Sequence, residues 1–160
     1  MEDCNHWQLE NVSANSITLL MTFDSIYNLR HSNIQALSKQ IRNGMILKAI
    51  EALQCHFPSL LFNDSQREPT ELLFSLQCQH FAELVRSNQI NQALEYAQKV
   101  LGPYAYQHPK TLNSLQDLVA LLAYDHPDKS PVSDFLSQSK RDNLAAAVNS
   151  AILRKILFDQ

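Results

Sequence analysis

The residues best suited to chemistry in this 160-residue chain are cysteines and histidines that lie close together in the sequence. Cys78 and His80 are two residues apart, and Cys55 adjoins His56. A structural zinc site needs four such ligands, commonly from paired short spacings. If residues 70–87 form a helix, positions 78 and 80 point about 200° apart and cannot share an ion. We therefore expect no metal site, and we expect Cys78 to be a core residue.

A second candidate set lies in a stretch interrupted by prolines, with Asp125, His126 and Asp128 close to Ser130. Asp and Ser are favoured in such stretches as turn and cap residues, and nothing here resembles a nucleophile elbow. The glutamates, Glu83 among them, are too scattered to name an acid–base pair.

Short basic pairs such as Lys140-Arg141 are typical of solvated helix faces. We therefore predict no catalytic residue and no cofactor, and expect that the chain is not an enzyme. The alternative is a small helical ligand-binding protein or enzyme in which the helix of His80 lines a cavity.

Composition favours a protein that binds other proteins. Charged residues make up 18% of the chain, below the usual ~25%, and the net charge is −3. Gln, Asn and Ser together outnumber the charged residues, and interface cores are depleted of charge. No nucleic-acid partner is expected without a basic field. The polar start and the lack of an apolar run of ~20 residues predict no signal peptide, no membrane partner, and a cytoplasmic or nuclear location.

Apolar residues recur at three- and four-residue steps along most of the chain, which predicts helices. The two glycines, Gly44 and Gly102, are too few for glycine-rich folds, and each is expected at a helix end. We predict an all-α fold of about seven helices in stacked antiparallel pairs. The expected helices cover residues 16–43, 46–56, 70–87, 89–101, 112–122, 130–136 and 140–157, and Pro69 is expected at the first position of the third.

Two segments repeat the same pattern. Residues 42–51 resemble residues 87–95, and Ala49 and Ala93 are 44 positions apart. In each segment a helix ends, a tight turn follows, and a new helix begins with a small residue. This is typical of the helix–turn–helix unit of an α-solenoid, and it predicts two helix pairs stacked side by side.

The last expected helix carries a stripe of small and branched residues. Two interpretations stay open: the stripe packs only within its own domain, or part of it is a surface for a partner helix. The stripe consists of Leu144, Ala147, Val148, Ala151, Ile152 and Ile156.

Several strings together resemble the CTLH/CRA domain family over about residues 30–155. The CTLH-like strings are Asn43-Gly44, AIEAL (49–53), FPSLL (57–61) and LLFSLQCQHFAELV (72–85). The CRA-like strings are ALEYAQ (93–98), LGP (101–103), LLAY (121–124), Pro127, Ser130-Pro131, NLA (143–145) and VNSAIL (148–153). The sequence is most similar to RanBPM-type and Twa-type subunits of the GID/CTLH ubiquitin ligase complex.

This resemblance implies a non-enzymatic scaffold or adaptor, a subunit or paralogue of such a ligase. Its implied partners are other CTLH, CRA or LisH proteins or ligase subunits, bound through helix–helix contacts, with self-association as a further expectation. RING-type ligands are absent from the sequence. The implied organisation is an N-terminal segment (1–29), partly loose or with a degenerate LisH-like helix, followed by CTLH-like helices (30–87) and CRA-like helices (88–157) that form one compact unit.

Overall fold

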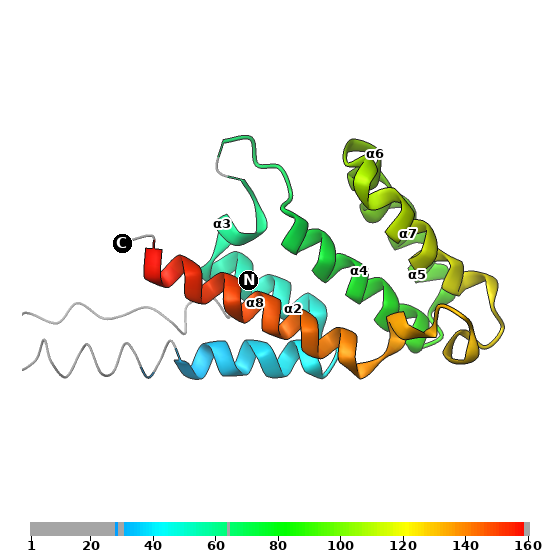
Figure 1. Ribbon diagram of the computed structural model, residues 1–160, viewed down its shortest axis with the longest axis horizontal. Helices are drawn as coiled ribbons and strands as arrows, with labels where there is room; N and C mark the ends of the chain where they lie inside the picture. Colours follow the sequence, from blue (N-terminus) through cyan, green and yellow to red (C-terminus); the bar gives the residue numbers. More distant parts are fainter. Residues whose placement is uncertain (1–27, 29–30, 64, 159–160) are drawn as a thin grey trace, which may run out of the picture.

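The structure, a computed structural model, describes residues 28, 31–63 and 65–158, and these are predominantly helical (Figure 1). Within this part of the chain, β structure is limited to one isolated bridge between Phe62 and Pro69. The prediction of an all-α fold is confirmed. The N-terminal segment 1–29, for which a degenerate LisH-like helix was one expectation, lies almost entirely outside the described residues. The helices are 31–42, α2 (Ile46–His56), α3 (Pro58–Leu61), α4 (Glu71–Arg86), α5 (Ile90–Tyr96), α6 (Gly102–Gln107), α7 (Leu112–Val119) and α8 (Gln138–Phe158).

The repeat of 44 residues is present in the backbone hydrogen bonds of two turns. Gly44, between the helix 31–42 and α2, has φ 76°, and Asn88, between α4 and α5, has φ 57°. Each turn closes its helix with a Schellman-type pair of bonds. The equivalent bonds are Gly44 N to Ile41 O and Asn88 N to Val85 O, both 3.0 Å, and Met45 N to Gln40 O and Gln89 N to Leu84 O, both 2.9 Å.

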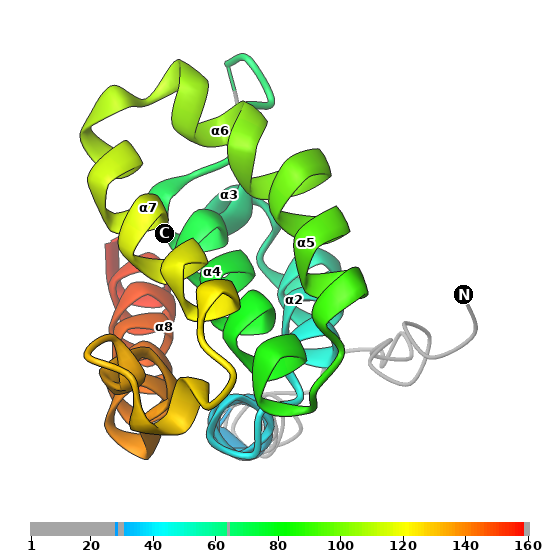
Figure 2. The same cartoon turned by 90° about the vertical axis from the view of Figure 1, so that its right-hand side faces the viewer.

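Small residues on the second helix of each pair allow close packing. Ala49 in α2 and Ala93 in α5 are both completely buried. In Figure 2, α4 lies between α2 and α5 on one side and α7 and α8 on the other. α4 is therefore the central helix, as its broad apolar circumference in the sequence suggests.

α4 begins at Glu71 with Thr70 as its N-cap, so Pro69 does not occupy the first helical position that the sequence predicted for it. The Thr70 hydroxyl accepts a hydrogen bond from Leu73 N (3.3 Å) and donates one to Leu60 O (2.7 Å). This side chain caps α4 and ties its start to α3. Pro69 precedes the cap, where its lack of an N–H costs the helix nothing.

The predicted helix end at Gly102-Pro103 is wrong. α5 continues into a π-helix, η2 (Ala97–Leu101), which leads directly into α6. Gly102 has helical angles and its N–H bonds Ala97 O, five residues back. A π-turn shifts the hydrogen-bond register, so Pro103 can follow without breaking the helix. Gly102 helps because a Cβ there would lie 3.3 Å from Ala97 O.

The segment between α7 and α8 consists of short 3-10 turns. The sequence predicted one short α-helix here, at residues 130–136. Prolines and Asp–Ser turn residues favour these short turns over a longer helix. They also link α7 to α8. The turns are η3 (Pro109–Thr111) before α7, then η4 (Ala120–Ala123), η5 (Pro127–Lys129) and η6 (Ser133–Leu136).

Two clusters of buried apolar side chains form the core, and α4 contributes to both. Leu76 belongs to the first cluster, with α2, α3, the helix 31–42 and α8. Phe81 belongs to the second, with α5, η2, α6 and α7. Full burial of such a side chain stabilises the fold by about 1.5–3 kcal/mol. α4 thus joins the two halves of the chain into one packed body.

Candidate protein-interaction surface

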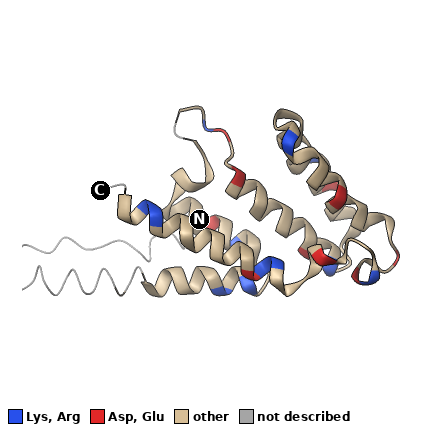
Figure 3. Ribbon diagram, in the orientation of Figure 1, with Lys and Arg blue, Asp and Glu red and all other residues tan. Residues whose placement is uncertain are grey.

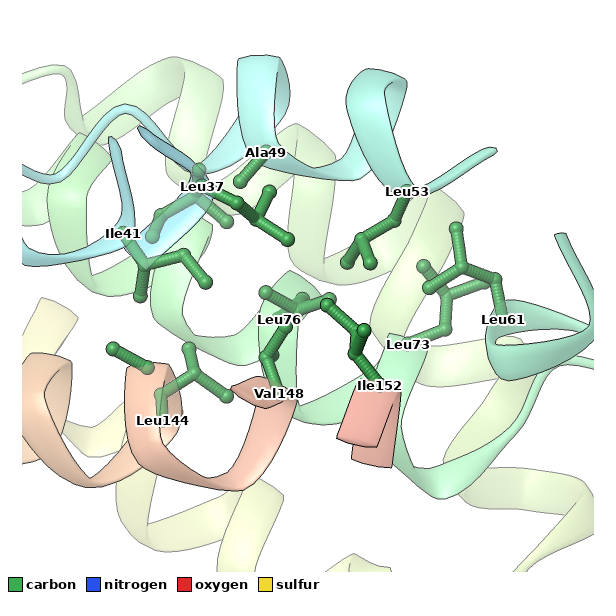
Figure 4. Close-up of a cluster of buried hydrophobic side chains, with 12 residues drawn as sticks. Leu37, Ile41, Ala49, Leu53, Leu61, Leu73, Leu76, Leu144, Val148 and Ile152 are labelled. Carbon is green, nitrogen blue, oxygen red and sulfur yellow. The ribbon is translucent and has the colours of Figure 1, made fainter. Parts of the chain in front are cut away.

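α8 faces its own core with half of the stripe predicted from the sequence. Leu144, Val148 and Ile152 are 8%, 1% and 0% exposed. Figure 4 shows them pointing toward Leu76 of α4, with Ile41 beside Leu144. These three side chains are therefore buried in the chain's own core.

The other half of the stripe is less buried. Ala147 is exposed, Ala151 is half-buried, and Ile156 is half-buried against the first core cluster. Leu153 and Leu157 are 43% and 68% exposed, one helical turn apart, and lie beside Ile156 around the helix. We call Leu153 and Leu157 the α8 apolar row.

Leu153 and Leu157 were not among the residues predicted from the sequence. Their four-residue spacing next to the stripe is a signal that could have found them. Figure 3 shows long uncharged stretches along the helices, consistent with the low charged fraction of the chain. An apolar row on such a surface is a candidate contact for another protein.

The start of α8 is fixed to α4 by an ion pair that is largely removed from solvent. Arg141 Nε donates to Glu83 Oε1 at 2.8 Å, and Arg141 Nη2 donates to Glu83 Oε2. Gln79 donates a further bond to Glu83 Oε1 (2.8 Å), and Arg86 Nε lies 3.3 Å from Oε2. A two-pronged arginine–carboxylate pair is strong and directional. α8 is therefore held in one orientation.

Burial alone would raise the pKa of Glu83. The hydrogen bonds from Arg141 and Gln79 and the charges of Arg141 and Arg86 outweigh burial and hold this pKa below its ordinary value. The same hydrogen bond to Glu83 raises the pKa of Arg141. Both groups are therefore charged at neutral pH.

The same corner holds the end of the helix 31–42. Gln138 Nε2 donates to Arg42 O at 3.1 Å, and Arg141 Nη1 reaches the same oxygen at 3.5 Å. A Cβ at Gly44 would lie 2.7 Å from Arg141 Nη2 and 2.9 Å from Glu83 Oε2. Glycine is thus needed at position 44 both for its positive φ and for the closeness of the ion pair.

His80 is packed against a neighbouring ring. It meets Tyr96 edge-on, with ring centres 4.9 Å apart. Burial lowers the pKa of His80, although the charge of Glu83 opposes this shift. Two cavities that border α4, of 620 and 360 Å³, do not include His80 in their walls. The ligand-binding alternative requires His80 to line a cavity, and His80 lines neither of these two.

Two of the cysteine and loop candidates, Cys78 and Ser130, have structural roles. Burial raises the pKa of Cys78 to about 12, so its thiol stays protonated. Ser130 donates a hydrogen bond to Pro127 O at 2.7 Å, which makes it a turn residue. Among the residues that the structure describes, no group of three His, Cys, Asp or Glu is placed to hold a metal ion. None of the described helices is long and apolar enough to cross a membrane.

Stacked helix pairs and an anchored last helix define an all-α helical domain. The chain belongs to the CTLH/CRA C-terminal to LisH motif domain family, whose model matches residues 30–159. The resemblance found in the sequence is thereby confirmed.

Curated relatives support the same family. The chain is 36% identical over 118 residues to "Protein GID8 homolog" of Arabidopsis thaliana, covering 74% of this chain and 46% of that protein. It is 36% identical over 134 residues to "Ran-binding protein M homolog" of Arabidopsis thaliana, covering 81% and 26%. It is 35% identical over 118 residues to "Glucose-induced degradation protein 8 homolog" of Dictyostelium discoideum, covering 74% and 50%. The matched region spans half or less of each of these relatives.

Proposed function

We propose that the chain is a non-enzymatic scaffold or adaptor subunit of a GID/CTLH-type E3 ubiquitin ligase assembly in the cytoplasm or nucleus. The observation that carries this proposal is the α8 apolar row, exposed on a helix whose other face is fixed in the core. The similarity to proteins named GID8 homolog and Ran-binding protein M homolog supports this kind of assembly.

The α8 surface has two properties that suit helix–helix contact. Ala147 and Ala151 leave room for a second helix to approach closely, and the row supplies apolar area beside them. The Glu83–Arg141 pair fixes the start of α8, so less conformational freedom is lost on binding. The partners are other CTLH, CRA or LisH proteins or ligase subunits, and a second copy of this chain is an additional partner for the same surface.

The alternative, a ligand-binding protein or enzyme that uses His80, has weaker support. His80 packs on Tyr96, and neither cavity beside α4 includes it in its wall. A binding pocket needs polar groups that converge on its interior.

Affinity purification of the tagged full chain, followed by mass spectrometry, tests the proposal. We expect RING-bearing CTLH subunits to copurify with the wild-type chain. Leu153→Asp with Leu157→Asp should remove them. Leu47→Asp with Leu94→Asp, two leucines of similar exposure on α2 and α5, should not.

The outcomes separate the function from the surface. If no ligase subunit copurifies with the wild-type chain, the proposed function fails. If the α8 variant retains its subunits, the α8 apolar row is not the contact. Circular dichroism melting curves show whether each variant remains folded.

A further inference from the structure

The helix 31–42 and α8 share the first core cluster, although they lie at opposite ends of the described chain. In Figure 1 the two helices run side by side, and Figure 4 shows Ile41 of the first helix beside Leu144 of α8. The buried side chains that the two helices give to this cluster are Leu37, Ile41, Leu144, Ala145, Val148 and Ile152. Movement of either helix away from the core would therefore expose apolar side chains of the other.

The last four carbonyl groups of the helix 31–42 all accept hydrogen bonds. Three of them, those of Lys39, Gln40 and Ile41, accept backbone N–H groups of the following turn, at distances between 2.9 and 3.0 Å. The fourth, Arg42 O, accepts a bond of 3.1 Å from Gln138 Nε2 in the first turn of α8. The last carbonyls of a helix need partners from outside the helix. The start of α8 thus caps the end of the helix 31–42.

The side chain of Gln138 is held in position for this bond. Its Nε2 also donates to Asp142 Oδ1 at 3.2 Å, and its Oε1 accepts a bond of 3.1 Å from Arg141 Nη1. Asp142 lies 3.6 Å from Arg42 Nε, but both of these side chains are at least half exposed, so this ion pair adds little by itself. Gln138 is therefore the residue whose amide group connects the two helices.

We propose that the helix 31–42 and α8 open and close as one cooperative unit, with Gln138 as the positioning residue that latches them together. Proteins open locally in such units, and hydrogen exchange measures the opening of each unit. The second core cluster draws on α5, η2, α6 and α7 instead, so these helices lie outside the unit.

This unit connects two parts of the chain that are distant in sequence. It carries the α8 apolar row, and its first helix joins residues 1–29 to the rest of the chain. A partner that stabilises one end of the unit will therefore also stabilise the other end. The coupling is a property of the free chain, so it stands or falls independently of the proposed ligase function.

Hydrogen exchange of the free, full chain tests the latch. Gln138→Leu keeps a side chain of similar length and helix propensity but removes its hydrogen bonds. We expect the amides of residues 43–45 to exchange about fivefold faster or more, because one lost hydrogen bond has an effect of this order. Gln138→Ala removes the same bonds and should act in the same direction. Gln116→Leu, at an exposed position of α7, is the matched control and should leave these amides at the wild-type rate.

Ala36→Gly tests whether the two helices open together. Ala36 is exposed within the helix 31–42, and glycine lowers the stability of a helix at such a position. If the helices form one unit, amides of residues 34–42 and of residues 144–152 should accelerate by a similar factor, about fivefold. Gln116→Gly is the matched control, which should accelerate exchange in α7 and leave α8 unchanged.

Three results would overturn the inference. The first is acceleration by Ala36→Gly that is confined to the helix 31–42. The second is equal acceleration in all helices, which would mean that the whole chain opens together. The third is exchange at residues 43–45 that neither Gln138 variant changes relative to Gln116→Leu. Circular dichroism of each variant confirms that it is folded before exchange is measured.

Discussion

Arg141 donates two hydrogen bonds to Glu83, a residue 58 positions earlier in the chain. This contact joins the first turn of α8 to the last turns of α4, directly beside the turn at Gly44. It fixes where α8 starts, and so it determines which side of α8 enters the core and which side remains for a partner.

Replacing Glu83 by Gln tests the ion pair through the dependence of stability on pH. The pKa of Glu83 is lowered in the fold, so its contribution is present above its ordinary value of 4.5 and is lost as pH falls through the folded value. The wild-type chain should lose stability on acidification below about pH 4.5, and Glu83→Gln should lose less. At neutral pH the variant should be less stable by on the order of 3 kcal/mol, since Arg141 loses its counter-charge.

Urea unfolding across about pH 3 to 7 provides the measurement. Glu51→Gln, an exposed change on α2, is the matched control and should follow the wild-type curve. Parallel curves for Glu83→Gln and the wild type would contradict the role given to this pair.

The turns at Gly44 and Asn88 allow a second, internally controlled prediction. Both residues have positive φ, so alanine is strained at either position. At position 44 the new Cβ also meets the ion pair, and Gly44→Ala should cost about 2 kcal/mol. Asn88→Ala should cost only about 1 kcal/mol. If thermal unfolding shows equal losses of stability for Gly44→Ala and Asn88→Ala, then the Glu83–Arg141 ion pair moves away from the new Cβ without an energetic cost.

The two sides of α8 should respond differently to charge. Val148→Asp with Ile152→Asp places two carboxylates in the first core cluster and should cost more than about 5 kcal/mol, which is comparable with the whole stability of a marginal domain. Leu153→Asp with Leu157→Asp changes exposed positions and should leave the melting temperature nearly unchanged. A folded Val148→Asp, Ile152→Asp variant would mean that α8 is not held in this core.

Local patterns in the sequence predicted most of the fold. Apolar spacing predicted the helices, and the spacing of Ala49 and Ala93 predicted the two repeated turns, which the hydrogen bonds confirm. The continuation of the helix through Gly102-Pro103 could not be predicted, because the π-turn depends on a shift of hydrogen-bond register.

The candidate surface was only partly predictable. The α8 stripe was visible as a pattern, but periodicity cannot say which of its residues the chain itself covers. Glu83 and Arg141 looked like an isolated acid and a solvated base, because their pairing depends on the fold that brings α4 and α8 together. Long-range contacts between charged residues have no signature in a single sequence.

The most direct test of the central claim is hydrogen exchange of the full chain, free and within the purified ligase assembly. We predict that amides of residues 150–158, which carry the α8 apolar row, exchange more slowly in the assembly, while those of α2 keep their rates. Protection at other helices with no change over residues 150–158 would contradict the assignment of α8 as the contact with other subunits.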